Sequence, residues 1–216
     1  MELPILTETA HYLAIHKPAG LLVERNPWEP SVESIVLEYL KQGHHRPFLG
    51  IVHRLDRVTS GVLLLAKKKN ALKVLNRQFA ERQVRKTYLA VVEQAPEKTE
   101  GKLEHWLFKD QLNKRAVVYE KQHKGAVPCS LSYTALSESL LEIHPDTGKF
   151  HQIRAQLAAI GCPIVGDSLY GAQQAYRPGA IMLHAWKLDF LGPPGQEAVR
   201  VEAPLPNEQL WQQAGL

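Results

Sequence analysis

The 216-residue sequence is poor in the features that mark secreted, metal-binding or membrane-spanning proteins. Its two cysteines, Cys129 and Cys162, are far apart and form no CxxC pair, so we expect reduced thiols and no disulfide, zinc or redox site. No apolar stretch approaches the roughly 18 residues that a membrane-spanning helix needs. The N-terminal residues MELPILTE lack the basic start and the apolar run of a signal peptide. We therefore expect no membrane contact and a cytoplasmic location.

Other absences narrow the class of protein further. Neither GxxxxGK[ST] nor GxGxxG occurs, which argues against the usual nucleotide cofactors. The histidines, including His44 and His45, lack Cys or acidic companions at ligand spacing, so no metal is expected. Length alone leaves one large domain or two small ones open. Because no linker of disordered composition divides the chain, we expect a single domain over residues 1–216. A monomer without a protein partner is the default expectation.

Positive charge is modest overall but concentrated in one stretch. The formal net charge is +4 and the sequence pI is near 9.0, which suits an anionic partner without requiring one. The concentrated basic residues are Lys67, Lys68, Lys69, Lys73, Arg77, Arg82, Arg85 and Lys86, opposed only by Glu81. This stretch is either a solvated helix face or a surface for an anionic partner, and composition alone leaves both open.

The hydrophobic pattern alternates short strand-like and helical segments and predicts a mixed α+β protein. Strands are expected at 11–16, 61–66, 87–93, 116–119, 131–136, 140–144 and 181–190, and helices at 31–40, after Asn70, at 151–160 and around Trp211. The continuous apolar run 61–66 is typical of a strand buried on both faces. The polar segment 93–125 predicts a protruding hairpin or insertion.

Two helices have recognisable apolar faces. In the segment 31–40, Val32, Ile35, Val36 and Tyr39 share one face, with Ser31 or Ser34 at its start and Gly43 at its end. In the next helix Asn70 is the expected N-cap, and the apolar stripe consists of Ala71, Leu72, Leu75 and Phe79.

Three segments concentrate polar chemistry. In GIVHRLDRVTSG (50–61), His53, Arg54 and Arg57 surround Asp56, and positive neighbours favour an ionised carboxylate that can act as nucleophile or base. In HPDTGKFHQIR (144–154), a turn leads into a helix that carries Gln152 and Arg154, a plausible phosphate or carboxylate site. In RKTY (85–88), two cations precede Tyr88. Each could also be an ordinary salt-bridged loop, helix start or core tyrosine.

The type and order of these segments resemble the RluA-like family of RNA pseudouridine synthases over nearly the whole chain. HRLDRVTSG is similar to the family's catalytic signature, RKTYLAVV to its tyrosine motif, and TGKFHQIRAQLAAIGCPIVGDSLYG to its third motif. The opening ILTETAHYLAIHKPAGLLV and the later IMLHAWKLDF resemble its first and last conserved strands. The resemblance implies the family's catalytic-domain fold, a mixed, largely antiparallel, bent β-sheet flanked by helices. It also implies no cofactor. Many members of the family carry a small RNA-binding domain before the catalytic domain, whereas we expect this chain to start directly at the catalytic domain.

The resemblance also assigns roles. Asp56 would be the catalytic carboxylate, attacking the sugar or assisting glycal formation, and Arg154 would pair with it. Tyr88 would stack on the base, because a phenol with a pKa near 10 is a poor base. Arg54 would fill the gap left by the flipped uridine. The remaining substrate contacts would be His53, Arg57, Lys86, Gln152, Ile153 and Leu183, with Lys67, Lys73 and Arg77 on the RNA backbone.

Some features depart from this pattern or allow other functions. Lys149-Phe150 stands where an arginine and a small polar residue are common, and Leu191-Gly192-Pro193 where a His-Pro is frequent, so we expect altered substrate contacts. HRLDR is not a kinase loop, since His-Arg-Asp-Leu and Asp-Phe-Gly are absent. The remaining alternative is a non-catalytic RNA-binding module of the same fold. The RNA, tRNA or rRNA, is left open.

Overall fold

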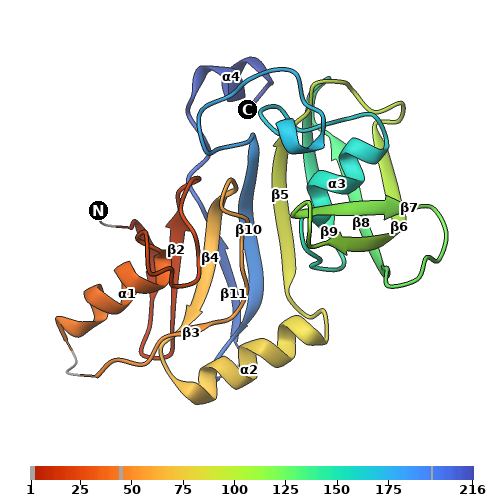
Figure 1. The fold of residues 1–216 in the computed structure, drawn as a ribbon. Helices are drawn as coiled ribbons and strands as arrows, with labels where there is room; N and C mark the ends of the chain where they lie inside the picture. Colours follow the sequence, from red (N-terminus) through yellow and green to blue (C-terminus); the bar gives the residue numbers. More distant parts are fainter. Residues whose placement is uncertain (1–2, 44–45, 196) are drawn as a thin grey trace. The chain divides into compact units, whose positions relative to one another are not determined.

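The computed structural model describes residues 3–43, 46–195 and 197–216. The chain forms two compact units, Met1–Lys86 with Ala185–Pro204, and Thr87–His184 with Leu205–Leu216. The boundaries fall inside two strands, β5 (Arg85–Val91) and β10 (Leu183–Gly192). Figure 1 labels the elements of both units.

The first unit is an antiparallel sheet with two helices. Its strands are β1 (Ile5–Glu8), β2 (Tyr12–Lys17), β3 (Gly50–Ile51), β4 (Ser60–Ala66), most of β10, and β11 (Glu197–Glu202). The order is β1-β2-β4-β10, with β3 added to β4 and β11 to β10. β2 lies antiparallel to β4 with Tyr12 opposite Ala66 and Lys17 opposite Gly61. Lys17 therefore sits at the end of the sheet where the 50–61 loop enters β4.

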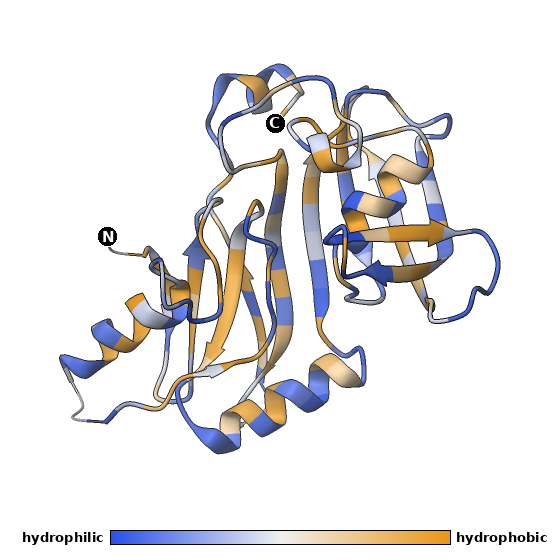
Figure 2. Cartoon of the chain, in the orientation of Figure 1, coloured by the Kyte–Doolittle hydropathy of each residue, from blue (hydrophilic) through white to orange (hydrophobic). Residues whose placement is uncertain are grey.

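Strand β4 and helix α2 (Lys69–Ala80) carry the core of this unit. Gly61–Ala66 is buried throughout, as the apolar run predicted, and Figure 2 shows β4 as an almost continuous hydrophobic strand. The stripe on α2 is confirmed, because Ala71 and Leu75 are buried and Leu72 and Phe79 pack against the same core. The predicted Asn70 cap is wrong. Lys68 holds the extended N-cap conformation and Lys69 is already helical, without a side-chain cap.

Helix α1 (Val32–Lys41) begins where the sequence indicates. Ser31 is the N-cap, and Ser31 and Ser34 bond reciprocally in a capping box. The expected apolar face is partly wrong. Val32 and Val36 are buried, but the third fully buried position is Leu40, whereas Tyr39 is 41% exposed. The Tyr39 hydroxyl instead donates to Glu8 Oε2 at 2.8 Å, so its polar end faces outward.

The second unit is an antiparallel sheet with three short helices. Its strands, in spatial order, are β5, β9 (Leu140–Pro145), β8 (Val127–Ala135), β6 (Glu100–Asp110) and β7 (Arg115–Tyr119). The helices are α3 (Gln152–Ala159), the 3-10 helix η1 (Ser168–Tyr170) and α4 (Gln209–Gln213). The polar segment 93–125 contains the predicted hairpin, formed by β6 and β7. Cys129 and Cys162 are both buried free thiols.

These elements make the chain an α+β protein, as predicted. The strand pairs β1–β2, β2–β4, β3–β4 and β10–β11 of the first unit are antiparallel, as are β5–β9, β9–β8, β8–β6 and β6–β7 of the second. Strands β1 and β3 and the full length of β6 were not predicted. Among the described residues, no helix is long and apolar enough to cross a membrane.

Candidate active site

Asp56 lies in the first unit, on the loop between β3 and β4. The loop is a short turn in which Thr59 N donates to Asp56 O at 3.1 Å. Its entry is anchored by His53, whose Nε2 accepts from Leu64 N of β4 at 3.0 Å and whose ring stacks on Phe79 at 4.9 Å. Burial, with a smaller contribution from the charge of Lys86, lowers the pKa of His53 to about 3. His53 is therefore neutral and holds the loop through Nε2, and its predicted contact with the substrate stays a prediction.

Lys17 ties the turn after β2 to the same loop. Its side chain is fully buried, and Nζ donates to Pro18 O at 2.8 Å, Leu21 O at 2.9 Å and Arg57 O at 3.2 Å. An ammonium has three N–H donors, so the charged form satisfies all three carbonyls. Burial lowers the pKa of Lys17 to about 7, and the Asp56 carboxylate opposes this shift. Lys17 thus fixes the backbone directly beside Asp56.

Arg57 and Arg54 connect the loop to the segment that follows β2. Arg57 Nε donates to Gly20 O at 2.9 Å, and its two terminal nitrogens donate to Glu29 at 2.9 and 2.8 Å. Arg54 pairs with Glu24 at 2.8 Å, and both of these side chains are mostly exposed. Arg54 is the predicted gap-filling residue, and an exposed ion pair of this kind holds it only weakly.

The predicted RNA-backbone residues differ in their surroundings. Lys73 and Arg77 are exposed on α2. Lys67 lies in an ion pair with Glu8 at 2.5 Å, and its side chain is only 16% exposed. The structure therefore leaves Lys73 and Arg77 accessible for an anionic partner, whereas Lys67 is already bound to a carboxylate.

Arg154 lies in the second unit and forms a buried ion pair there. Its Nε and Nη2 donate to the two oxygens of Asp167 at 2.7 and 2.8 Å, and the side chains are 6% and 2% exposed. Two parallel charge-assisted bonds fix the plane of the guanidinium. The predicted pairing of Arg154 with Asp56 joins residues of different units and stays a prediction.

Tyr170 supports Arg154 from another side. The guanidinium carbon lies 5.0 Å from the centre of the Tyr170 ring. The Tyr170 hydroxyl accepts from Ala116 N of β7 at 2.7 Å and lies 2.9 Å from His151 Nδ1. His151 precedes α3 in the left-handed conformation, with φ of 52°. These contacts fasten the start of α3 to the sheet of this unit, and with it the Arg154 side chain.

Gln152 has structural contacts where a substrate contact was predicted. Its Oε1 accepts from the Thr147 hydroxyl at 2.7 Å and from Lys149 N at 3.0 Å, while Nε2 donates to Ser130 O at 3.0 Å. The side chain is 4% exposed. Gln152 therefore shapes the turn between β9 and α3.

The other predicted residues of the second unit differ in burial. Ile153 is 7% and Leu183 3% exposed, so both are buried apolar side chains. Tyr88 lies on β5 opposite Ile143 of β9 and is only partly buried. Its predicted stacking on the target base stays a prediction.

Two residues that position the site do not stand out in the sequence. Asp167 lies in the quoted GDSLYG segment, but its spacing of 13 residues from Arg154 follows no helical or strand period. Lys17 is recognisable there only as part of a turn. Its signal was a lysine at the end of an otherwise apolar strand, where a buried charge requires several hydrogen bonds.

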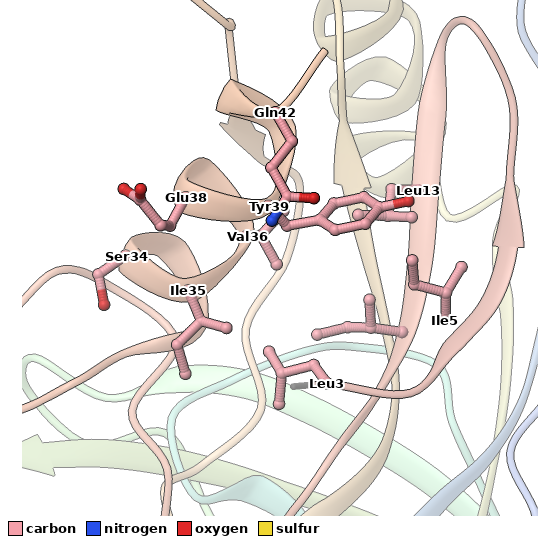
Figure 3. A pocket seen from close by; sticks show the side chains of 10 residues that line it. Leu3, Ile5, Leu13, Ser34, Ile35, Val36, Glu38, Tyr39 and Gln42 are labelled. Carbon is pink, nitrogen blue, oxygen red and sulfur yellow. The ribbon is translucent and has the colours of Figure 1, made fainter. Parts of the chain in front are cut away.

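A cavity of the first unit lies apart from the predicted residues. It has a volume of about 570 Å³ and lies between α1 and the β1–β2 hairpin. Figure 3 shows Ile35, Val36 and Tyr39 of α1 on one side and Ile5 and Leu13 on the other. None of the predicted site residues lines it. Within residues 3–43, 46–195 and 197–216, no cluster of three or more metal-ligating side chains occurs; His44 and His45 lie outside the described residues.

Comparisons with known proteins identify the family. Residues 11–159 match the family model described as RNA pseudouridylate synthase. The chain is 33% identical to tRNA pseudouridine synthase C of Yersinia pestis, over 93% of this chain and 86% of that protein. It is also 33% identical to ribosomal large subunit pseudouridine synthase D of Nitrosomonas europaea, over 95% of this chain and 63% of that longer protein.

A solved structure agrees with this result. Human RNA pseudouridylate synthase domain containing 4 superimposes with a TM-score of 0.80 and 25% identity, covering 98% of this chain and 91% of that chain. The matched segment contains the loop of Asp56, the strand of Tyr88 and the helix of Arg154. The chain therefore belongs to the RNA pseudouridylate synthase family and is an isomerase that converts uridine in RNA to pseudouridine.

Proposed function

We propose that the RNA modified by this enzyme is tRNA or rRNA and that Asp56 is its catalytic carboxylate. The first part is supported by the names of two relatives, one a tRNA synthase and the other a synthase for the large ribosomal subunit. The second part is supported by one observation above all, the anchoring of the Asp56 loop. Lys17, His53 and Arg57 each bond it to a different neighbouring segment. A reacting group must be held within a fraction of an ångström, and these bonds provide that precision.

The reaction rearranges bonds within one nucleoside. The N1–C1′ bond of uridine breaks, a C5–C1′ bond forms, C5 loses its proton and N1 gains one. Atoms and electrons balance without water, an oxidant or a cofactor. Asp56 acts either by attacking C1′, which forms a sugar ester, or by removing the C2′ proton, which forms a glycal. In both routes an ionised carboxylate stabilises an electron-poor sugar carbon, as in glycosidases.

Arg154 is proposed to orient Asp56. A guanidinium remains charged at all working pH values and can serve two carboxylates through separate N–H groups. Nε and Nη2 are bound to Asp167. In this proposal Asp167 fixes the guanidinium plane through these two nitrogens, and the charged guanidinium keeps Asp56 ionised and oriented.

The remaining residues are proposed to bind the flipped uridine and its surroundings. Tyr88 stacks on the uracil, Ile153 and Leu183 enclose it, and Arg54 leaves Glu24 to fill the gap in the RNA. Unstacking a base costs a few kcal/mol, and these contacts offset that cost. Lys73 and Arg77 bind phosphates, which makes affinity fall with salt.

The test compares wild type with Asp56→Asn on tRNA and large-subunit rRNA purified from cells that lack this protein. Pseudouridine is measured by mass spectrometry of nuclease digests, and RNA binding by filter retention. We expect one RNA fraction to gain pseudouridine with wild type and none with the variant, while binding stays within about twofold. Asp189→Asn, on β10, is the matched control and should remain active. Pseudouridine formation by Asp56→Asn at a rate near wild type would refute the assignment.

We further propose that the chain acts as one domain and as a monomer in the cytoplasm. The absence of a disordered linker in the sequence supports one domain, and the tRNA and ribosomal substrates in the names of the relatives support the location. Size-exclusion chromatography with light scattering should give a mass near 24.3 kDa. A mass twice as large would contradict the monomer.

A further inference from the structure

Trp28 is the most exposed large hydrophobic residue among the described residues. Its side chain is 92% exposed, on the segment Glu24–Pro30 between the turn after β2 and helix α1. Single apolar residues on a surface are ordinary and need no explanation by themselves. Trp28 differs because the backbone that carries it is fixed and lies next to the Asp56 loop.

Hydrogen bonds within the segment hold the Trp28 backbone. Trp28 N donates to Asn26 Oδ1 at 2.9 Å, and Asn26 Nδ2 donates to Glu29 Oε1 at 3.3 Å. This is an Asx turn, in which a side chain replaces a backbone acceptor. Pro27 precedes Trp28 directly and restricts the backbone further. The indole is thus presented outward from an ordered turn.

The same segment is joined to the Asp56 loop on both sides of Trp28. The carboxylate of Glu29, the next residue, accepts hydrogen bonds from both terminal nitrogens of Arg57. The carboxylate of Glu24, four residues before Trp28, accepts a hydrogen bond from Arg54. Arg54 and Arg57 flank Asp56 within four residues of sequence. The segment that carries Trp28 is therefore bonded to the Asp56 loop at two points.

We propose that Trp28 is a stacking site for a nucleobase of the substrate RNA next to the target uridine. This inference rests on the proposed RNA substrate and adds a binding residue to it. An indole face stacks on any base, which is worth about 1–3 kcal/mol and depends little on sequence. The exposed side chains of Arg25, on the same segment, and of Arg54, on the Asp56 loop, can bind the phosphates of a stacked nucleotide, which favours a nucleotide over an apolar partner. When RNA phosphates compete for Arg54, its exposed pair with Glu24 can open at little cost.

The proposal predicts a binding defect without a chemical defect. Trp28→Ala should raise the Kd and KM for the modified RNA by about 5- to 150-fold, the range that corresponds to one stacked base. The kcat should stay within about twofold, since the indole binds the ground state and the transition state equally. Trp28→Phe should restore most of the affinity because it retains an aromatic face. Leu136→Ala, which removes another exposed apolar side chain, is the matched control and should bind as wild type.

The measurement is filter binding and steady-state pseudouridine formation with the tRNA or rRNA fraction that wild type modifies. Both Trp28 variants should keep the wild-type unfolding midpoint, because an exposed side chain contributes little to folding. RNA should also quench tryptophan fluorescence less in Trp28→Phe than in wild type. Wild-type affinity of Trp28→Ala, or an equal loss in Trp28→Phe, would overturn the proposal.

A second arm separates this inference from the proposed function. The Trp28→Ala substitution is repeated in the Asp56→Asn protein, and only RNA binding is measured. A loss of affinity there supports the stacking site even if Asp56 proves not to be catalytic. If the wild-type enzyme is active and Trp28→Ala leaves RNA affinity unchanged in both the wild-type and the Asp56→Asn protein, the stacking site is refuted and the proposed function is not.

Discussion

The buried pair of Arg154 and Asp167 gives the sharpest prediction. Asp167→Asn keeps the shape of the side chain and removes its charge. The two bonds are 2.7 and 2.8 Å long and both partners are almost fully buried. Removing one charge of a buried pair costs about 3–5 kcal/mol. For a chain of this length 1 kcal/mol corresponds to about 2–4 °C, so the unfolding midpoint should fall by about 6–20 °C.

The same substitution should reduce catalysis more than binding. Without the carboxylate, the guanidinium plane is no longer fixed, and a misplacement of about 1 Å in a catalytic group can cost about 100-fold in rate. We therefore expect kcat to fall by up to about 100-fold at a temperature well below the midpoint, with KM nearly unchanged. Differential scanning fluorimetry and steady-state pseudouridine assays measure the two effects.

A matched control tests whether burial is the cause. Asp189 forms an Arg–Asp pair with Arg200 at 2.6 Å, but the arginine side chain is 56% exposed. Asp189→Asn should cost less than about 1 kcal/mol and leave kcat unchanged. If Asp167→Asn matches Asp189→Asn in both midpoint and kcat, the reasoning from burial and guanidinium orientation is wrong.

Three further predictions concern acid stability, the strand after the catalytic loop, and salt. Because burial lowers the pKa of His53 to about 3, the unfolded chain binds a proton below about pH 6.5 that the folded chain does not. The urea midpoint should therefore fall between pH 7 and pH 5, and less so in His53→Gln; equal losses would contradict this. A Cβ on Gly61, where φ is +119°, would lie 2.1 Å from a backbone oxygen of β10, whereas Gly161, with φ of +78°, has open space. Gly61→Ala should cost about 3 kcal/mol or more and Gly161→Ala about 1 kcal/mol in urea unfolding, and similar costs would refute the clash. Lys73→Gln and Arg77→Gln should each lower the slope of log Kd against log salt by about 1, and unchanged slopes would exclude them as phosphate contacts.

The local structure of this protein follows closely from its sequence. The spacing of apolar residues along β4 and α2 predicted correctly which faces of these elements are buried, because this spacing can be read from neighbouring residues alone. Ser31 and Ser34 cap α1 through bonds that close within four residues. The predictions failed where local signals compete. Lys68 and not Asn70 holds the N-cap position of α2. Tyr39 remains 41% exposed, because its hydroxyl binds Glu8 while its ring lines the cavity beside α1.

The candidate site shows the same division between local and long-range information. The sequence motifs identify Asp56, Tyr88 and Arg154, and the family confirms the chemistry to which these motifs belong. The partners that fix them come from distant segments. Lys17 reaches the carbonyl of Arg57 across 40 residues, and Asp167 binds Arg154 without any period that connects them.

The sequence by itself therefore determined the class of fold and the family, because these depend on residue identity and short-range pattern. Only the tertiary structure decided which polar side chains hold the site together. The hydrogen bonds of His53 and Gln152 fasten a loop and a turn, which the sequence did not indicate, and their predicted contacts with the substrate stay predictions. The physical reason is that the hydrogen-bonding partners of a polar side chain decide whether its role is structural. Folding brings those partners from distant parts of the chain.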